Sequence, residues 1–388
     1  MLKCASVYTY EIDNHETALA EIKAQLDKKI TLLKNSVGII MSHPEFITSG
    51  VLKYICDNLP FGIAGVTTAS QAVNDEFGEL ILTLFVMTSD DVWFKTGVAD
   101  NLNEGIDEPV RAAYEKAAEG EAEPPGLAIL FPPFLIKQYA GDAYLKAWKK
   151  VIPNAPLFGT LAIDDTVSFN ECETIYNGMN KKDAMPFVLC YGNINPRFLV
   201  ATLPKDNNVP LHAEVTKSSG SLVQEINHIK VRKFFEDVGI YNENMLTVPL
   251  FVDLTKRDDY DGVPVANGIA VFKEDGSAIF CGDVDEGSAF SLLSFTVEGI
   301  LSTSLREIKR ISEQSNVNGA LLFPCVARRV ALMGANKPLA ELQVAKDEIN
   351  PNIPFMMGYA GGEICPTSII NGAPTNRFHT YSLVILVI

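Results

Sequence analysis

The sequence predicts an α/β fold in which three related strand–helix–strand units form layered mixed sheets covered by helices, together with one inserted α+β segment. Apolar runs of strand length alternate with stretches of helical periodicity along most of the chain. Three of these runs, at residues 37–44, 127–133 and 319–325, end alike, and each leads into a helical stretch and a short apolar element that ends in glycine. Such internal repetition indicates duplication of one structural unit.

The first unit is expected over about residues 1–90 and the second over about 91–195. In the first, Asp13 and Glu16 form a capping box, which predicts a helix directly after the opening strand. The strands predicted in these two units cover residues 6–10, 37–44, 60–65, 80–87, 92–98, 127–133, 155–159 and 187–191.

The third unit is expected over about residues 278–388, after an insert at about 196–277. We predict that a strand at 278–284 opens this unit and that a long helix follows over 288–314. Within the insert, the Asp275-Gly276 pair predicts a β-hairpin, because the turn between its strands requires positive φ.

Composition limits the functional classes. The 388 residues carry 48 acidic and 32 basic side chains, a net charge of −16, which argues against binding nucleic acid or an anionic membrane surface. No apolar run approaches the ~20 residues of a membrane-spanning helix, and the N-terminus lacks a signal-peptide pattern. Seven scattered cysteines without a C-x-x-C pair indicate reduced, buried thiols, so we expect a cytoplasmic protein.

A glycine-rich loop after residue 357 is the strongest candidate binding element. Its glycines let backbone N–H groups approach a ligand oxygen, and its glutamate provides a carboxylate for an ammonium group. The alternative is a tight turn that needs glycine for steric reasons alone. The candidate ligand-binding residues of this loop are Gly358, Tyr359, Gly361, Gly362 and Glu363.

The corresponding loops of the other two units differ in character. The first carries Thr67, whose small hydroxyl group can bind backbone or ligand. The second, at residues 159–165, has lost this character and is interpreted as structural.

Cys325 ends the apolar run of the third unit, at the position that His43 holds in the first. A nucleophilic Cys325 would need a base, for which His379 and His43 are the candidates. The alternative is a buried thiol that packs as a small apolar side chain. Arg328 follows closely and would either clamp a carboxylate or form an ion pair within this acidic protein.

The common enzyme fingerprints are absent. The sequence contains no G-x-x-x-x-G-K-[ST], G-x-G-x-x-G, G-x-S-x-G or H-E-x-x-H pattern, which lowers the odds of a common nucleotide-binding enzyme, hydrolase or zinc enzyme.

Residues 319–328, the loop 358–364 and the Phe378-His379 pair together resemble the C-terminal domain of the FIST family, named for F-box and intracellular signal transduction. Residues 37–65 with Thr67 resemble its N-terminal domain. On this resemblance we expect a FIST N-terminal domain over 1–198, holding the first two units, and a FIST C-terminal domain over 199–388. The chain departs from the family pattern at Thr380, where asparagine is common, and in the first-unit loop, which lacks the usual Gly-Glu pair.

The resemblance implies an intracellular sensory protein that binds a small ligand, such as an amino acid or related metabolite, and relays the signal to a partner protein that supplies the output. It implies no cofactor and no metal. Matched to the family pattern, the ligand-binding residues would be Cys325, Arg328, Gly362, Glu363 and His379. The alternatives are an enzyme that uses Cys325 as nucleophile with a histidine base, and a scaffold without a ligand.

Overall fold

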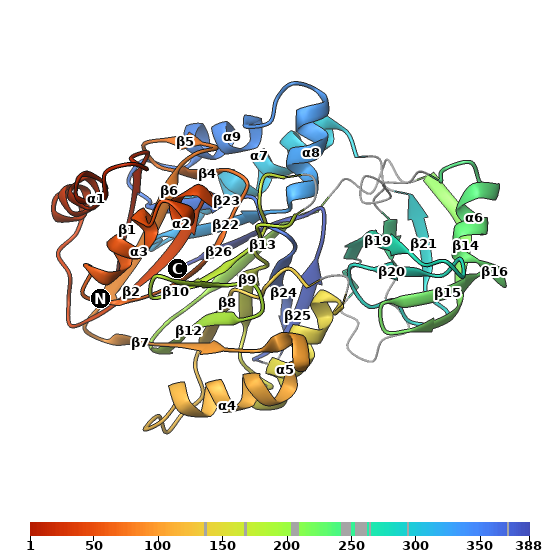
Figure 1. The fold of residues 1–388 in the computed structure, drawn as a ribbon, viewed down its shortest axis with the longest axis horizontal. Helices are drawn as coiled ribbons and strands as arrows, with labels where there is room; N and C mark the ends of the chain where they lie inside the picture. The colour runs from red at the N-terminus through yellow and green to blue at the C-terminus, as the bar shows by residue number, and fades with distance from the viewer. Residues whose placement is uncertain are drawn as a thin grey trace.

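The computed structural model describes residues 1–135, 138–166, 169–202, 209–241, 250–252, 262–263, 265–292, 295–370 and 372–388. Figure 1 shows a body of sheets with helices on its outside and a smaller lobe beside it. The predicted α/β class, with mixed sheets covered by helices, is confirmed.

The body contains three sheets that share one four-strand order. In the first sheet this core is β1-β6-β2-β3, where β2 and β3 are parallel and the other neighbours are antiparallel. Its unit consists of β1 (Lys3–Thr9), α1 (His15–Lys29), β2 (Asn35–Ser42), α2 (Glu45–Thr48), α3 (Val51–Asp57), β3 (Gly62–Thr67), β4 (Gln71–Val73), β5 (Phe77–Gly78) and β6 (Leu82–Ser89). The predicted cap is off by one residue: Asn14, and not Asp13, caps α1, because its side-chain oxygen accepts a hydrogen bond from Thr17 N at 2.9 Å.

The second sheet repeats this arrangement with the core β7-β12-β8-β9, in which β8 and β9 are the parallel pair. Its unit consists of β7 (Val92–Ala99), the short 3₁₀ helix η1 (Leu102–Glu104), α4 (Asp107–Ala117), β8 (Leu127–Leu130), α5 (Gly141–Val151), β9 (Leu157–Thr160), β10 (Thr174–Tyr176), β11 (Met179–Lys181) and β12 (Met185–Gly192).

The third sheet has the core β13-β26-β22-β23, with β22 and β23 parallel. Its unit consists of β13 (Arg197–Ala201), α7 (Val297–Glu313), β22 (Ala320–Pro324), α8 (Val326–Gly334), α9 (Ala340–Glu348), β23 (Phe355–Gly358), β24 (Glu363–Ile370), β25 (Ala373–His379) and β26 (Leu383–Val387).

Two predicted elements of the third unit are wrong. The strand predicted at 278–284 does not open this sheet, because β20 (Ala278–Phe280) pairs with strands of the insert, and β13 takes the outer position instead. The helix predicted from residue 288 begins at Val297, since Ala289–Leu292 forms strand β21 and the Thr296 side chain caps α7 by accepting from Gly299 N at 3.1 Å.

The insert between β13 and α7 forms a separate lobe around an eight-stranded sheet, which we call the insert lobe. Its elements are β14 (Val209–Ser219), β15 (Leu222–Ile226), β16 (Ile229–Lys230), α6 (Val231–Asp237), β17 (Leu250–Val252), β18 (Val265–Asn267), β19 (Ile269–Phe272), β20 and β21. The predicted hairpin is confirmed as β19–β20, and Gly276 supplies the positive φ of 80° at its turn.

Each unit of the body passes a hairpin to the sheet of another unit. The β4–β5 hairpin of the first unit extends the third sheet beyond β23, and β10–β11 of the second extends the first sheet beyond β3. The β24–β25 hairpin of the third unit extends the second sheet beyond β9. The exchange closes into a ring, so the sheets are held together by backbone hydrogen bonds as well as by side-chain packing.

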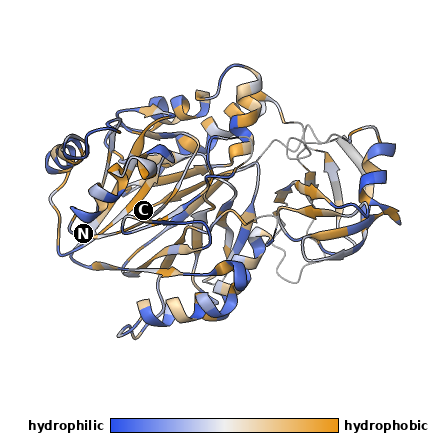
Figure 2. Cartoon of the chain, viewed as in Figure 1, coloured by the Kyte–Doolittle hydropathy of each residue, from blue (hydrophilic) through white to orange (hydrophobic). Residues whose placement is uncertain are grey.

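The three sheets also share a core. Ile39, Ile129 and Leu322, one from each central strand, are completely buried in the same apolar cluster. Their neighbours Ile40 and Leu130 point the opposite way and belong to the clusters beneath the outer helices, as the two-residue period of a strand requires. Figure 2 shows apolar strands inside the body and helices with mixed, partly hydrophilic colouring around it. Within the described part of the chain, no helix is both long and apolar enough to cross a membrane.

Candidate ligand-binding site

The three loops that follow the parallel strands β3, β9 and β23 meet at one place. Three backbone hydrogen bonds link them in pairs: Ile163 N to Thr67 O (3.1 Å), Gly361 N to Leu161 O (3.0 Å) and Tyr359 N to Ser70 O (3.1 Å). Each loop is also tied to its own unit in the same manner, since Thr68, Ala162 and Ala360 donate their N–H groups to the carbonyl oxygens of Ser42, Pro132 and Pro324. The carboxyl ends of strands from three distant parts of the sequence therefore converge.

A cavity of about 440 Å³ lies beside this junction. Cys325 at the end of β22, Gly361 in the third loop and Cys281 of the insert lobe all contribute to its wall. The cavity thus lies where the body and the insert lobe meet, and clefts between such parts are common ligand sites.

Two aspartates of the second loop form the acidic part of the wall. Asp164 is completely buried, and its carboxylate accepts hydrogen bonds from the backbone N–H and hydroxyl of Thr166 and from Glu171 N. Asp165 is more exposed, and its Oδ2 lies 3.2 Å from Nε2 of His43. His43 Nδ1 accepts a long hydrogen bond from Glu45 N, at 3.3 Å, and this tautomer places the Nε2–H group toward Asp165 as a hydrogen-bond donor.

Four aromatic rings line the same cavity in two edge-to-face pairs. Phe134 and Phe169 have their centroids 5.5 Å apart, and Phe295 and Tyr381 have theirs 5.3 Å apart. Phe169 and Tyr381 have left-handed backbones, with φ of 51° and 56°.

This backbone conformation is unusual for bulky residues. The other non-glycine residues with positive φ in the described part of the chain are asparagines and one histidine, which tolerate it more readily. A strained residue costs about 1–3 kcal/mol and persists only where its surroundings hold it, often at binding sites. Both strained aromatic residues line this cavity, which makes it the candidate binding site.

Arg328 holds one of them in place. Its guanidinium is completely buried and donates to Glu341 Oε1 at 2.9 Å, to Ser304 Oγ at 2.6 Å and to the carbonyl oxygens of Ile300 and Tyr381. The side chain is not part of the cavity wall, so the predicted clamp on a ligand carboxylate is not observed. Arg328 instead positions the backbone of Tyr381, and the ring of Tyr381 forms part of the cavity wall.

Arg329, the next residue, does reach the wall. Its Nη2 donates to Glu79 Oε1 of the first unit at 2.7 Å, which pairs its charge across two units. Its Nε is buried without a hydrogen-bond partner among the described residues.

Glu363 is completely buried behind the two cysteines of the wall. Neither of its oxygens has a partner at ordinary hydrogen-bond geometry within the described ranges. Burial raises the pKa of its carboxyl group well above the usual range, although the nearby Cys325 thiol and the Arg328 guanidinium oppose the shift. Burial raises the pKa of the Cys325 and Cys281 thiols, and the nearby Glu363 carboxyl group raises it further. For Cys281 the pKa rises to about 12.

The other predicted residues lie around the cavity rather than in its wall. His379 pairs with Glu363 across the β24–β25 hairpin, and its Nε2 lies 3.1 Å from the carbonyl oxygen of Cys365. The hydroxyl of Thr67 accepts from Glu173 N at 2.9 Å, which ties the first loop to the segment before β10. The remaining three are structural neighbours of the loop junction: Gly358, Tyr359 and Gly362.

We expect the native protein to show no reactive thiol. All seven cysteines are free and buried, and the raised pKa values keep Cys281 and Cys325 in the thiol form. An aromatic disulfide reagent should react slowly with the folded protein at pH 8 and with all seven thiols after unfolding in guanidinium. Because the pKa of Cys281 is about 12, its reaction rate should keep rising through pH 10 rather than level off near 9. Rapid reaction at pH 7, mapped to Cys325 by mass spectrometry, would instead support the nucleophile hypothesis.

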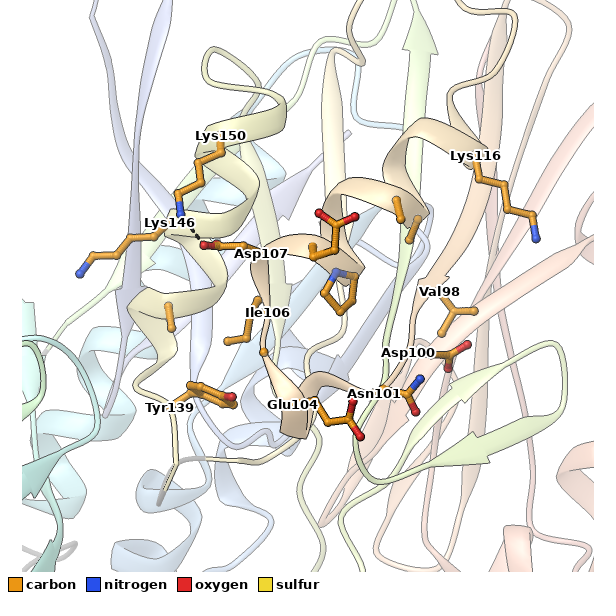
Figure 3. Close-up of a pocket in the computed structure, with 16 residues that line it drawn as sticks. Val98, Asp100, Asn101, Glu104, Ile106, Asp107, Lys116, Tyr139, Lys146 and Lys150 are labelled. Carbon is orange, nitrogen blue, oxygen red and sulfur yellow. Dashed lines mark hydrogen bonds and ion pairs between the residues drawn. The ribbon is translucent and has the colours of Figure 1, made fainter.

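A second, larger groove of about 980 Å³ lies on the outside of the second unit, between η1, α4 and α5. Figure 3 shows its polar side chains, with Lys150 and Asp107 paired at 2.5 Å. Of the described residues that line it, none is a predicted site residue. Within the described part of the chain, no group of three or more His, Cys, Asp or Glu side chains is placed to hold a metal ion.

Two family models match most of the chain. The FIST N domain matches residues 36–229 and the FIST C domain matches residues 233–366. The chain belongs to the FIST family. No curated protein matches it. FIST domains are associated with sensing in signal transduction, and the cavity lies between the two matched segments, since Asp165 falls in the FIST N match and Cys325 in the FIST C match.

Sequence reasoning missed much of this FIST cavity. It assigns a structural role to the second loop, whereas Asp164 and Asp165 lie in the wall. The signal that could have found them is the pair of adjacent acidic residues itself, at the end of a loop that follows a strand. No pattern in the sequence marks Tyr381 or Phe169, whose importance comes from backbone conformation and packing.

Proposed function

We propose that this FIST protein is a sensory protein that binds a small ligand, an amino acid or related metabolite, in the cavity beside the loop junction. The observation that carries the proposal is that both strained aromatic residues, Phe169 and Tyr381, line this cavity. The cavity combines charged groups with aromatic surface, the usual composition of a small-molecule site. The seven free cysteines favour a reducing compartment, so we place the protein in the cytoplasm. We also propose that the FIST N-terminal domain covers residues 1–198 and the FIST C-terminal domain residues 199–388.

The insert lobe is the element through which occupancy of the cavity would reach a partner protein. It contacts the body beside the cavity through Gly141 N to Cys281 O at 3.0 Å and Asp283 N to the Asp142 carboxylate at 2.8 Å. The hydroxyl of Thr380, another wall residue, donates to Ala266 O at 2.8 Å. A ligand that touches both sides of this contact would stabilise the docked lobe, which is how a ligand biases a two-state element.

A thermal-shift screen of the full chain tests ligand binding. A ligand that binds only the folded state at a hundred times its Kd adds about 2.7 kcal/mol to the free energy of unfolding, and so raises Tm. Hydrogen exchange with the stabilising compound should then show added protection at the lobe contact around Cys281. If no amino acid or metabolite raised Tm and no small molecule co-purified, the proposal would be wrong.

Filling the cavity should abolish this response. Ala327 lies on α8 in the cavity wall, so Ala327→Leu places added methyl groups in the cavity while keeping a good helix former. We expect the affinity for any stabilising compound to fall by about fivefold or more, since overpacking costs about 1–3 kcal/mol. The matched control is Ala24→Leu on the exposed side of α1, which should leave affinity unchanged by calorimetric titration.

A further inference from the structure

We propose that the ligand of this cavity is an organic ammonium compound, an amine cation with an apolar body, recognised by Asp165 and the surrounding aromatic rings. The inference rests on the proposed function and narrows it to one charge class.

The fixed charges around the cavity favour a cation. The partners of the Asp164 carboxylate are neutral backbone, hydroxyl and thiol donors, so these hydrogen bonds orient its charge without cancelling it. Asp165 Oδ2 lies 3.2 Å from Nε2 of His43, and a hydrogen bond from the neutral form of that ring would orient the carboxylate without cancelling its charge. The guanidinium of Arg329 is paired with Glu79, which offsets the positive charge on the wall.

The aromatic rings favour the same ligand. An ammonium group over an aromatic face gains about 0.5–2 kcal/mol, more when water is excluded, and cages of several rings recognise alkylated amines. The Phe134–Phe169 and Phe295–Tyr381 pairs bring four aromatic rings to the wall of one cavity. These rings also offer apolar surface for the body of the ligand.

Glu363 lies close to Cys325 of the wall but adds no fixed negative charge. It is completely buried, and burial raises the pKa of its carboxyl group well above the usual range, which favours the neutral acid. The carboxylates that line the cavity are therefore those of Asp164 and Asp165.

The main rival is a zwitterion. Arg329 Nε–H is buried without a partner in the described structure and would suit a ligand carboxylate. An amino acid would then place its ammonium group at Asp165 and its carboxylate at Arg329. An amine and an amino acid differ only in whether a ligand carboxylate contributes to binding. Matched compounds with and without this group therefore distinguish the two classes.

The test is calorimetric titration of the full chain with four compounds that share a phenylethyl body: 2-phenylethylamine, phenylalanine, 3-phenylpropionate and 2-phenylethanol. We expect the amine to bind at least tenfold more tightly than the alcohol and the carboxylate to bind most weakly. Asp165→Asn should weaken the amine by tenfold or more and leave the alcohol within twofold. The control Asp57→Asn, at an exposed aspartate paired with Lys53, should change neither affinity.

Other orders of affinity among the four compounds overturn the inference. Tighter binding of phenylalanine than of the amine would establish a zwitterion site, and equal or tighter binding of the carboxylate or alcohol would exclude charge recognition; in both cases the proposed function survives. If none of the four binds, the charge of the compounds found in the thermal-shift screen decides: cationic compounds uphold the inference, and anionic or neutral ones refute it. If nothing in the screen binds, the proposed function itself fails.

Discussion

Replacement of Arg328 by methionine is expected to lower the free energy of unfolding by about 3–5 kcal/mol, because it leaves the charge of Glu341 buried and unpaired. Both side chains of this ion pair are fully buried, with Nη2 and Oε1 2.8 Å apart. The variant also removes the donor to the Ser304 hydroxyl and the donors to the carbonyl oxygens of Ile300 and Tyr381. Urea unfolding followed by circular dichroism measures the loss.

Two further variants separate the cause. Arg328→Met combined with Glu341→Met removes both charges, and we expect it to recover a large part of the lost stability, since replacing a whole buried pair by apolar side chains is often neutral or stabilising. Arg111→Met is the exposed control, because Arg111 pairs with Glu108 on the surface of α4 and such pairs contribute about 0–1 kcal/mol. A single Arg328 variant as stable as this control would contradict the assignment of Arg328 as a buried structural residue.

Replacement of Gly65 by alanine is expected to cost about 3 kcal/mol or more, at the upper end of overpacking effects. Gly65 lies opposite Ile40 in the parallel β2–β3 pair, and an added Cβ would stand 1.8 Å from the Ile40 carbonyl oxygen. That atom belongs to a central strand with partners on both sides, so the pair cannot separate without disturbing the first sheet. Urea unfolding measures the decrease in the free energy of unfolding. In the extreme case the soluble variant would lack the native circular dichroism spectrum.

The second unit offers an independent check of this argument. Gly159 occupies the equivalent place opposite Leu130, where an added Cβ would lie 2.0 Å from the carbonyl oxygen, so Gly159→Ala should be similarly harmful. The control is Gly334→Ala at the end of α8, where no atom lies within 4 Å of the added carbon. If Gly65→Ala and Gly334→Ala were equally stable, the close approach of β2 and β3 would not limit this position.

The parts of the fold that depend on local sequence patterns could be predicted. Alternating apolar runs and helical stretches identify the α/β class, and the Asp275-Gly276 turn identifies the β19–β20 hairpin, because both depend on neighbouring residues. The strand at β20 was assigned to the wrong sheet, since an apolar run of three to seven residues carries no information about its partner. The start of α7 was misplaced for the same reason: residues 289–292 pair with β14 and β17, and this pairing overrides a helical pattern.

The candidate site also contains residues that the sequence predicts and residues that it does not. Cys325 and Gly361 were predicted and lie in the cavity wall, because the ends of strands in repeated units mark where loops gather. Of the two roles predicted for Arg328, a ligand clamp or an ion pair, the structure shows the ion pair, formed with Glu341 on α9. Asp165 was passed over because only the folded chain brings its loop beside Cys325 and the insert lobe.

The sequence by itself determined the α/β class and most of the elements, because periodicity, capping residues and turn glycines act over a few positions along the chain. Only the tertiary structure decided which strands join which sheet, since the exchange of hairpins among the three units depends on pairings between residues far apart in sequence. It also decided the character of the cavity. The left-handed backbones of Phe169 and Tyr381 and the pairing of Arg329 with Glu79 follow from how the units pack, and the proposed cation site depends on these features.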